Sequence, residues 1–168
     1  GANDGVVTRR RPGSTLKPFV YARYLEEGGT LADPIADLPT HLKTRRGSWS
    51  PENFDRRFHG PISVRESLAG SLNVPAVLVA NVTGVPTLIE DLRALGMPMM
   101  ERAEEDHGLG LALGNAEVSL LELAAAYATF GRGGRWRPAS TTAMELAVSG
   151  EQERQVYSPE VAFLILDA

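Results

Sequence analysis

The chain has 168 residues, of which 43% are hydrophobic and 23% are charged, and its net charge is −4. These values predict one globular domain with a hydrophobic core, and they exclude a typical nucleic-acid binder, which would be strongly basic. The absence of cysteine excludes disulfides and thiolate chemistry, and the three histidines lack the spacing of metal ligands, so we expect no metal site. No apolar run reaches the roughly 18 residues of a membrane span. The start has no signal-peptide pattern either, so we expect any anchor to lie outside this chain.

The first predicted helix spans residues 14–27. Apolar side chains recur on one face at positions 16, 20 and 24, and two glycines at 28 and 29 end the helix. The preceding residues 1–13 are expected to be irregular, with a break at Pro12-Gly13 directly before Ser14. Residues 30–62 contain four prolines and three large aromatic side chains, and this pattern predicts a long ordered loop, a class that is often functional.

Three helices are predicted between residues 63 and 95. Ser63 and Glu66 form a capping box for a helix that runs to about Gly70, and residues 71–73 then interrupt the chain. Residues 75–83 predict a helix that is apolar on nearly every side. Residues 86–95 predict an amphipathic helix. Its leucines at 88, 92 and 95 are expected to face inward, and Glu90, Asp91 and Arg93 are expected to face outward.

The last third of the chain begins with a glycine-rich segment at residues 106–116. A second capping box, Ser119 and Glu122, starts a helix over 119–130 that is apolar all round and is therefore expected to be buried. Residues 131–142 predict a short strand or hairpin, bent at Pro138. Ser158 then caps a final helix. The chain stops inside this apolar helix, which suggests a fragment of a longer protein.

Ser14 and Lys17 are the first candidates for chemistry. They are three residues apart at the start of a helix, so their side chains are neighbours on one face. A serine hydroxyl becomes a nucleophile when a base takes its proton, and a lysine amine can do so when burial lowers its pKa. The alternative is that Ser14 is an ordinary helix cap and that the spacing arises by chance.

Ser71 and Asn73 are the second pair of candidates. They lie between two predicted helices, where a second serine could relay a proton and an asparagine amide could hold a substrate carbonyl. The alternative is that Asn73 caps the helix that begins near Pro75, and both interpretations could hold together.

Ser-Thr-Leu-Lys at 14–17 and Ser-Leu-Asn at 71–73 follow the order of the S-x-x-K and S-D-N motifs of penicillin-binding proteins and class A β-lactamases. The surrounding segments RRPGSTLKPFVYA, SPENFDRRFHGPISVRESLAGSLNVPAV and GLGLALGNAEVSLLELAAAYATFGRGG are more specific. They resemble the transpeptidase domain of bifunctional class A penicillin-binding proteins, most closely the 1C type. The resemblance covers nearly all of residues 5–168.

The resemblance implies that Ser14 is the acylated serine, that Lys17 is its base, and that Ser71 and Asn73 form the second motif. It implies a mainly α fragment of the α/β fold shared by serine β-lactamases and penicillin-binding proteins, in which residues 1–168 form a helical subdomain and most of the central sheet is missing. The third motif, a K-T-G strand, is expected downstream. Lys43-Thr44-Arg45 is rejected as this motif, because arginine replaces the glycine and the segment precedes the second motif.

The implied activity is that of a peptidoglycan D,D-transpeptidase that cross-links the cell wall by acyl transfer through Ser14. This reaction needs neither a metal nor an organic cofactor. The implied partners are stem peptides ending in D-Ala-D-Ala, β-lactams and other cell-wall synthesis proteins, and not nucleic acid. The implied location is the periplasmic face of the cytoplasmic membrane, with the anchor and a glycosyltransferase domain outside this chain. We expect the 168-residue chain alone to be inactive or very slow.

Two alternatives are considered. In the first, this chain is a catalytically inactive helical subdomain that binds partners or ligands. In the second, the parent protein is a D,D-carboxypeptidase or β-lactamase relative. The segment over residues 52–77 argues against this second alternative, because it resembles the biosynthetic transpeptidases.

Overall fold

The computed structural model describes residues 4–44, 47–97, 108–140, 142 and 152–168. Its helical elements are η1 (Gly13–Leu16), α1 (Lys17–Glu26), α2 (Val64–Ala69), α3 (Asn73–Thr83), α4 (Val85–Ala94), η3 (Gly108–Leu113), α6 (Leu120–Gly131) and α8 (Pro159–Asp167). Its strands are β1 (Pro34–Asp37), β2 (Leu42–Thr44), β3 (Gly47–Trp49), β4 (Gly60–Ser63), β5 (Arg135–Trp136) and β6 (Arg154–Gln155). The strands form three separate antiparallel pairs in the described part of the chain, so the fold is mainly helical, as predicted.

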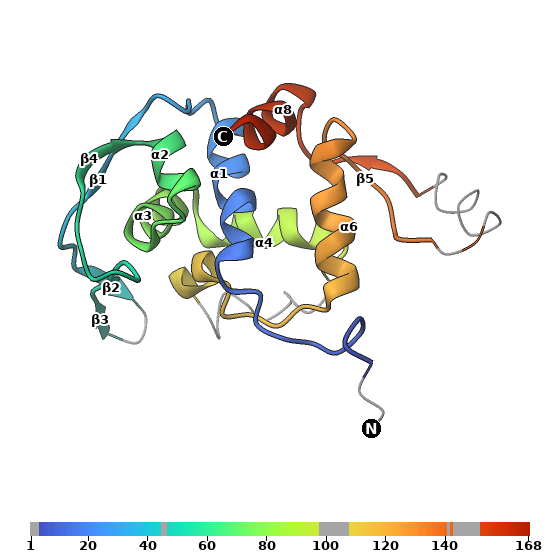
Figure 1. Ribbon diagram of the computed structural model, residues 1–168, viewed down its shortest axis with the longest axis horizontal. Coiled ribbons are helices and arrows are strands. Elements are labelled where there is room, and N and C mark those ends of the chain that lie inside the picture. Colours follow the sequence, from blue (N-terminus) through green and yellow to red (C-terminus); the bar gives the residue numbers. More distant parts are fainter. Residues whose placement is uncertain (1–3, 45–46, 98–107, 141, 143–151) are drawn as a thin grey trace.

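Helix α1 passes through the middle of the molecule, with α2 and α3 on one side, α6 on the other and α8 at one end (Figure 1). It packs against α3, α4 and α8. Most of its side chains are buried, including Phe19, Val20 and Tyr21, and the burial extends to Lys17 at its start. This central position explains why a lysine at the first turn of a short helix is removed from solvent.

The predicted helix starts are confirmed by their caps. The Ser63 hydroxyl accepts from the Glu66 backbone amide at 3.2 Å, and the Glu66 carboxylate accepts from the Ser63 amide at 2.8 Å. Ser119 and Glu122 form the same reciprocal pair, with distances of 3.2 and 2.9 Å. The Ser158 hydroxyl accepts from the Val161 amide at 3.3 Å. These caps could be predicted from the sequence because the two residues of each cap are three positions apart.

The prediction that Asp91 faces outward is wrong. Its side chain is 6% exposed, and it accepts hydrogen bonds from both Nε, at 2.8 Å, and Nη2 of Arg23 on α1. Burial raises the pKa of the Asp91 carboxyl, and the Arg23 hydrogen bond opposes this shift. The ion pair therefore joins α1 to α4 inside the molecule, because the buried carboxylate requires a charged partner.

Replacing Asp91 with alanine is expected to lower the free energy of unfolding by about 3 kcal/mol, because it leaves the Arg23 guanidinium partly buried without its counter-ion. Chemical denaturation followed by circular dichroism measures this loss. Glu90→Ala is the matched control, since Glu90 is the exposed neighbouring carboxylate on the same helix, and it should change the value by less than about 0.5 kcal/mol. Equal midpoints for the two variants would contradict the prediction.

The prediction that the helix over 119–130 is buried all round is also wrong. Ala126, Thr129 and Phe130 are buried, but Leu120 and Leu121 are 58% and 42% exposed. The exposed face of α6 borders a surface depression of about 600 Å³, which Arg132, Arg137, residues 138–140 and Thr142 complete. An apolar sequence indicates which side chains favour burial, and it does not show whether a neighbouring element covers each of them.

Residues 30–62, predicted as a long loop, contain four short strands. β1 pairs with β4 in the register Pro34↔Ser63 to Asp37↔Gly60, and β2 pairs with β3. The prolines at the ends of this register hide the strand pattern, since proline is tolerated only at strand edges and ends. The β1–β4 pair packs against α2 and α3, which brings Asp37 and the segment after β3 close to the start of α3.

No helix in the described ranges has both the length and the apolar character to span a membrane.

Candidate active site

Ser14 and Lys17 lie on one continuous helical unit. Gly13 has a φ of +60°, which glycine adopts without strain, and it turns the chain into η1. Ser14 lies in this 3₁₀ turn with its side chain exposed, and Lys17 is the first residue of α1. The S-x-x-K spacing thus places an accessible hydroxyl one turn before a buried amine.

The Lys17 amine is directed at the second motif. It donates to the Asn73 side-chain oxygen at 2.7 Å, to the Ser71 hydroxyl at 3.3 Å and to the Ser71 carbonyl. Burial lowers the pKa of Lys17 to about 8. A lysine with this pKa is deprotonated in part near neutral pH, unlike an ordinary lysine, and its neutral amine can act as a general base.

Ser71 has an unusual backbone. Its φ is +50°, in the left-handed region that residues other than glycine rarely occupy. In this conformation both its carbonyl and its hydroxyl lie within hydrogen-bonding reach of the Lys17 amine. Backbone strain of this kind, about 1 kcal/mol or more, is found preferentially at functional sites. No pattern in the sequence predicted this conformation.

Asn73 is not a side-chain cap for the helix near Pro75. It is the first residue of α3, and the capping position belongs to Leu72, which has no side-chain hydrogen bond. The Asn73 amide instead accepts from Lys17 through its oxygen and donates to the Glu52 carbonyl at 3.0 Å through its nitrogen. Of the two interpretations considered from the sequence, a role in the site is therefore the better supported.

The structure thus brings together Lys17, Ser71 and Asn73. Ser14 precedes Lys17 by one turn, but within the described residues no hydrogen bond joins its hydroxyl to the Lys17 amine. The depression against α6 is lined by none of the four residues, so it is not the site that the two motifs predict.

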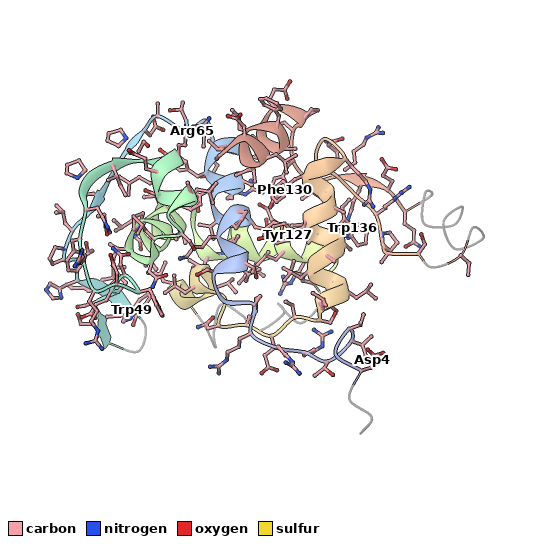
Figure 2. The ribbon with its side chains drawn as sticks, viewed as in Figure 1. Asp4, Trp49, Arg65, Tyr127, Phe130 and Trp136 are labelled. Carbon is pink, nitrogen blue, oxygen red and sulfur yellow. The ribbon has the colours of Figure 1, made fainter. Side chains whose placement is uncertain are left out.

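The turn that carries Ser14 is held by two elements to which the sequence assigned no role. The Gly13 amide donates to the Gly114 carbonyl at 3.2 Å, so the end of η3 lies against the residue before Ser14. The Tyr127 hydroxyl donates to the Thr15 carbonyl at 2.7 Å. Figure 2 shows Tyr127 and Phe130 between α6 and α1, and Tyr127 meets the Phe19 ring edge-on at 5.2 Å. These contacts fix both sides of the turn that carries Ser14.

Replacing Gly114 with alanine is expected to slow acylation of Ser14 roughly tenfold to a hundredfold, because small displacements of reacting groups have effects of this size. A Cβ atom at this position would lie 2.1 Å from the Gly13 carbonyl oxygen and 2.4 Å from the Gly13 nitrogen, so the turn must move. The rate of reaction with a labelled penicillin measures the effect in the full-length gene product.

Gly108→Ala is the control for this substitution. Gly108 also has a positive φ, +50°, but a Cβ atom there would meet nothing within 4 Å. This variant should lose about 1 kcal/mol of stability through backbone strain and keep its acylation rate. Similar rates for both variants would show that the contact with Gly13 does not position Ser14.

Comparison with known proteins agrees with the family resemblance that the motifs indicate. The sequence model of the penicillin-binding protein transpeptidase domain matches residues 2–166. The chain therefore belongs to the penicillin-binding protein transpeptidase domain family. It is 44% identical to penicillin-binding protein 1C of Escherichia coli over 135 residues, covering 80% of this chain and 17% of that protein, which confirms the resemblance to the 1C type. It is 32% identical to penicillin-binding protein 1A of Neisseria meningitidis over 179 residues, covering 97% of the chain and 22% of that protein. The chain thus spans about a fifth of the length of these relatives.

Solved structures agree with this assignment. Penicillin-binding protein 1A from Haemophilus influenzae matches with a TM-score of 0.73 and 32% identity over 81% of this chain and 20% of that one. Penicillin-binding protein A from Mycobacterium tuberculosis, solved as an imipenem acyl-enzyme complex, matches with a TM-score of 0.77 over 98% of this chain and 44% of that one. At 21% identity, the second match shows the fold alone.

Proposed function

We propose that the protein carrying this chain is a peptidoglycan D,D-transpeptidase that acts by acyl transfer through Ser14. The observation that carries the proposal is the buried Lys17 amine, which contacts Ser71 and Asn73 and follows the exposed Ser14 by one turn. Family membership and the order of the motifs support it.

In this mechanism the Ser14 oxygen attacks the carbonyl carbon of the D-Ala-D-Ala bond as its proton passes to the Lys17 amine. The proton is then returned to the departing amine of D-alanine. Ser71, whose hydroxyl lies 3.3 Å from the lysine, provides a route for this return. The acyl group is finally transferred from Ser14 to an amine of a neighbouring stem peptide, which restores the free hydroxyl. The Asn73 amide nitrogen has two hydrogens, and Glu52 takes one of them, so the other can bind a substrate carbonyl.

A β-lactam would acylate Ser14 in the same way and form a stable ester. Acyl-enzyme complexes with imipenem, penicillin G and ceftriaxone are known for the Mycobacterium tuberculosis protein. We further propose that the whole protein is anchored in the cytoplasmic membrane and acts on its periplasmic face. There it would also carry a glycosyltransferase domain and meet other cell-wall synthesis proteins. Its relationship to proteins of the 1C and 1A types supports this location.

Reaction of the full-length gene product with a labelled penicillin tests the proposal. One adduct per molecule is expected, mapped to Ser14 by peptide mass spectrometry, and Ser14→Ala should form none. Ser48→Ala, at an exposed serine on β3, is the matched control and should label normally. A wild-type protein that never labels would favour the alternative of a helical binding subdomain.

A stem peptide offered with an amine acceptor separates transpeptidation from hydrolysis. We expect a cross-linked product. Release of D-alanine without cross-linking would indicate a D,D-carboxypeptidase, and rapid turnover of the penicillin would indicate a β-lactamase. Either result would overturn the proposed reaction while leaving Ser14 as the nucleophile.

A further inference from the structure

The Asn53 side chain is a buried connection between two parts of the molecule that are distant in sequence. It lies between β3 and β4 and is 3% exposed. Its nitrogen donates to the two carboxylate oxygens of Asp37 at 2.8 and 2.9 Å. Its oxygen accepts from the backbone amides of Asn73 and Val74 at 2.9 and 3.1 Å. Both the nitrogen and the oxygen of the Asn53 side chain therefore have hydrogen-bond partners, and the oxygen contacts the backbone of the second motif.

Asn53 supplies the cap that α3 lacks. The first backbone amides of a helix have no partner within the helix, and the residue at the capping position commonly supplies one. In α3 that residue is Leu72, whose side chain cannot accept a hydrogen bond. The Asn53 oxygen takes its place from 20 residues upstream. The start of α3, and with it the backbone of Asn73, is thereby fixed to the segment after β3.

The neighbouring Glu52 fixes the Asn73 side chain. The Glu52 carbonyl accepts from the Asn73 amide nitrogen at 3.0 Å, which directs the amide oxygen to the Lys17 amine at 2.7 Å. Two consecutive residues thus hold Asn73, one through its backbone and one through its side chain. A shift of residues 52–53 would move Asn73 and its contact with Lys17 together.

Asp37 determines which way the Asn53 amide points. Its side chain is fully buried at the end of β1, and it also accepts from the backbone amide and the Nδ1 of His59, at 2.9 and 2.7 Å. An ionised carboxylate accepts hydrogen bonds and cannot donate them, so the Asn53 nitrogen must face it. The Asn53 oxygen must then face the amides of α3. The Arg57 backbone carbonyl also accepts from the Asn53 nitrogen, at 2.8 Å, and favours the same orientation. Reversing the amide would therefore break the bonds at both of its ends.

We propose that Asn53, oriented by Asp37, is a positioning residue of the transpeptidase site: it sets the place of Asn73 and, through Asn73, the position of the Lys17 amine. The inference rests on the proposed function. It assigns a role to residues outside the two motifs, which act on the reaction only through Asn73.

A double-mutant cycle in the full-length gene product tests the inference. Asn53→Ala is expected to slow acylation by a labelled penicillin roughly tenfold to a hundredfold, chiefly in the rate at saturating penicillin. In the Asn73→Ala background, the same substitution should slow the reaction by less than about threefold, because residues that act through one another are not additive. An equal slowing in both backgrounds, or no slowing in the first, would overturn the inference.

An exchange of the two side chains provides a second test that does not depend on Asn53→Ala folding. Asn53→Asp alone places two carboxylates together, and Asp37→Asn alone leaves two amides facing each other. Each single variant should slow acylation at least about tenfold, because like charges or mismatched donors disturb the buried contact between positions 37 and 53. The double variant restores one donor and one acceptor and puts a carboxylate at the start of α3, which a helix N-terminus favours. A carboxylate at position 53 cannot donate to the Arg57 carbonyl, so the rescue should be partial. The double variant should still react at least about threefold faster than the slower single variant. A double variant as slow as the slower single variant would contradict the proposal.

Ser158→Ala is the matched control, because it removes the cap of a different helix, α8. It should lower the melting temperature and leave the acylation rate unchanged.

The proposed function and the positioning role of Asn53 would be contradicted by different results. If wild-type protein is never acylated at Ser14, the proposed function fails. If wild type is acylated and Asn53→Ala reacts equally fast, only the positioning role fails.

Discussion

Replacing Lys17 with methionine is expected to slow acylation of Ser14 roughly a hundredfold to ten-thousandfold, the range over which a positioned general base accelerates proton transfer. Methionine fills a similar volume but cannot accept a proton from the Ser14 hydroxyl. It also removes the donor to the Ser71 carbonyl and the Asn73 oxygen, so the second motif loses the contact that holds it to α1. The loss should exceed that of any substitution that only displaces the site.

The rate of labelling by penicillin in the full-length gene product measures this effect. Lys43→Met is the matched control, because Lys43 is an exposed lysine on β2, and it should react like wild type. Lys17→Arg separates charge from basicity, since arginine keeps the positive charge but stays protonated. It should be about as slow as Lys17→Met. A Lys17→Met variant that reacts as fast as Lys43→Met would exclude Lys17 as the base.

The pKa of Lys17 gives this prediction a pH dependence. Because burial lowers the pKa to about 8, the acylation rate should rise as the pH increases through 8 and then level off.

The free energy of unfolding should also depend on the ionisation of Lys17. An unfolded lysine has a pKa of about 10.4, so between pH 8 and 10 the unfolded chain binds more protons than the folded one. The Lys17 contribution to the free energy of unfolding therefore rises with pH in this window. Denaturation of wild type and Lys17→Met at pH 7.5 and 9.5 measures it, and an unchanged difference would contradict the lowered pKa.

The 168-residue chain alone is expected to react with labelled penicillin at least roughly a hundredfold more slowly than the full-length gene product, the typical effect of losing one oxyanion donor. In the family this chain resembles, the third-motif strand supplies that donor and a cationic contact to the substrate carboxylate. The 168 residues contain no K-T-G segment, and Lys43-Thr44 lies on the β2–β3 hairpin. The nucleophile turn and second motif are present, so slow residual labelling at Ser14 is consistent with the expectation.

Matched time courses with the same labelled penicillin measure the difference. Ser14→Ala in both proteins identifies the labelled residue. Rapid stoichiometric labelling of the short chain would show that the described residues already form a complete site and that the third motif has been misplaced. Failure of the full-length protein to label would instead favour the non-enzymatic alternative.

The parts of this structure that could be predicted from sequence are those encoded by near neighbours. The Ser63 and Ser119 capping boxes, the S-x-x-K turn and the break at residues 71–73 each depend on residues within one helical turn. The positions of Asp91 and Asn53 could not be predicted in this way. Asp91 pairs with a residue 68 positions away, and Asn53 binds residues 16 and 20 positions away. For each, the buried environment comes from elements that the local pattern does not contain.

The central position of α1 has a consequence for how the protein is made. Phe19 on α1 stacks on Phe130 of α6 at 5.2 Å, and Phe130 stacks on Tyr157 at 5.6 Å. The helix that follows Ser14 is therefore synthesised before its aromatic neighbours, which leave the ribosome more than a hundred residues later. Contacts between such distant segments form slowly, because a long loop must close first. During synthesis, Ser14 and Lys17 therefore lie on an incompletely packed helix until α6 and Tyr157 have followed, and the site can be assembled only after that point.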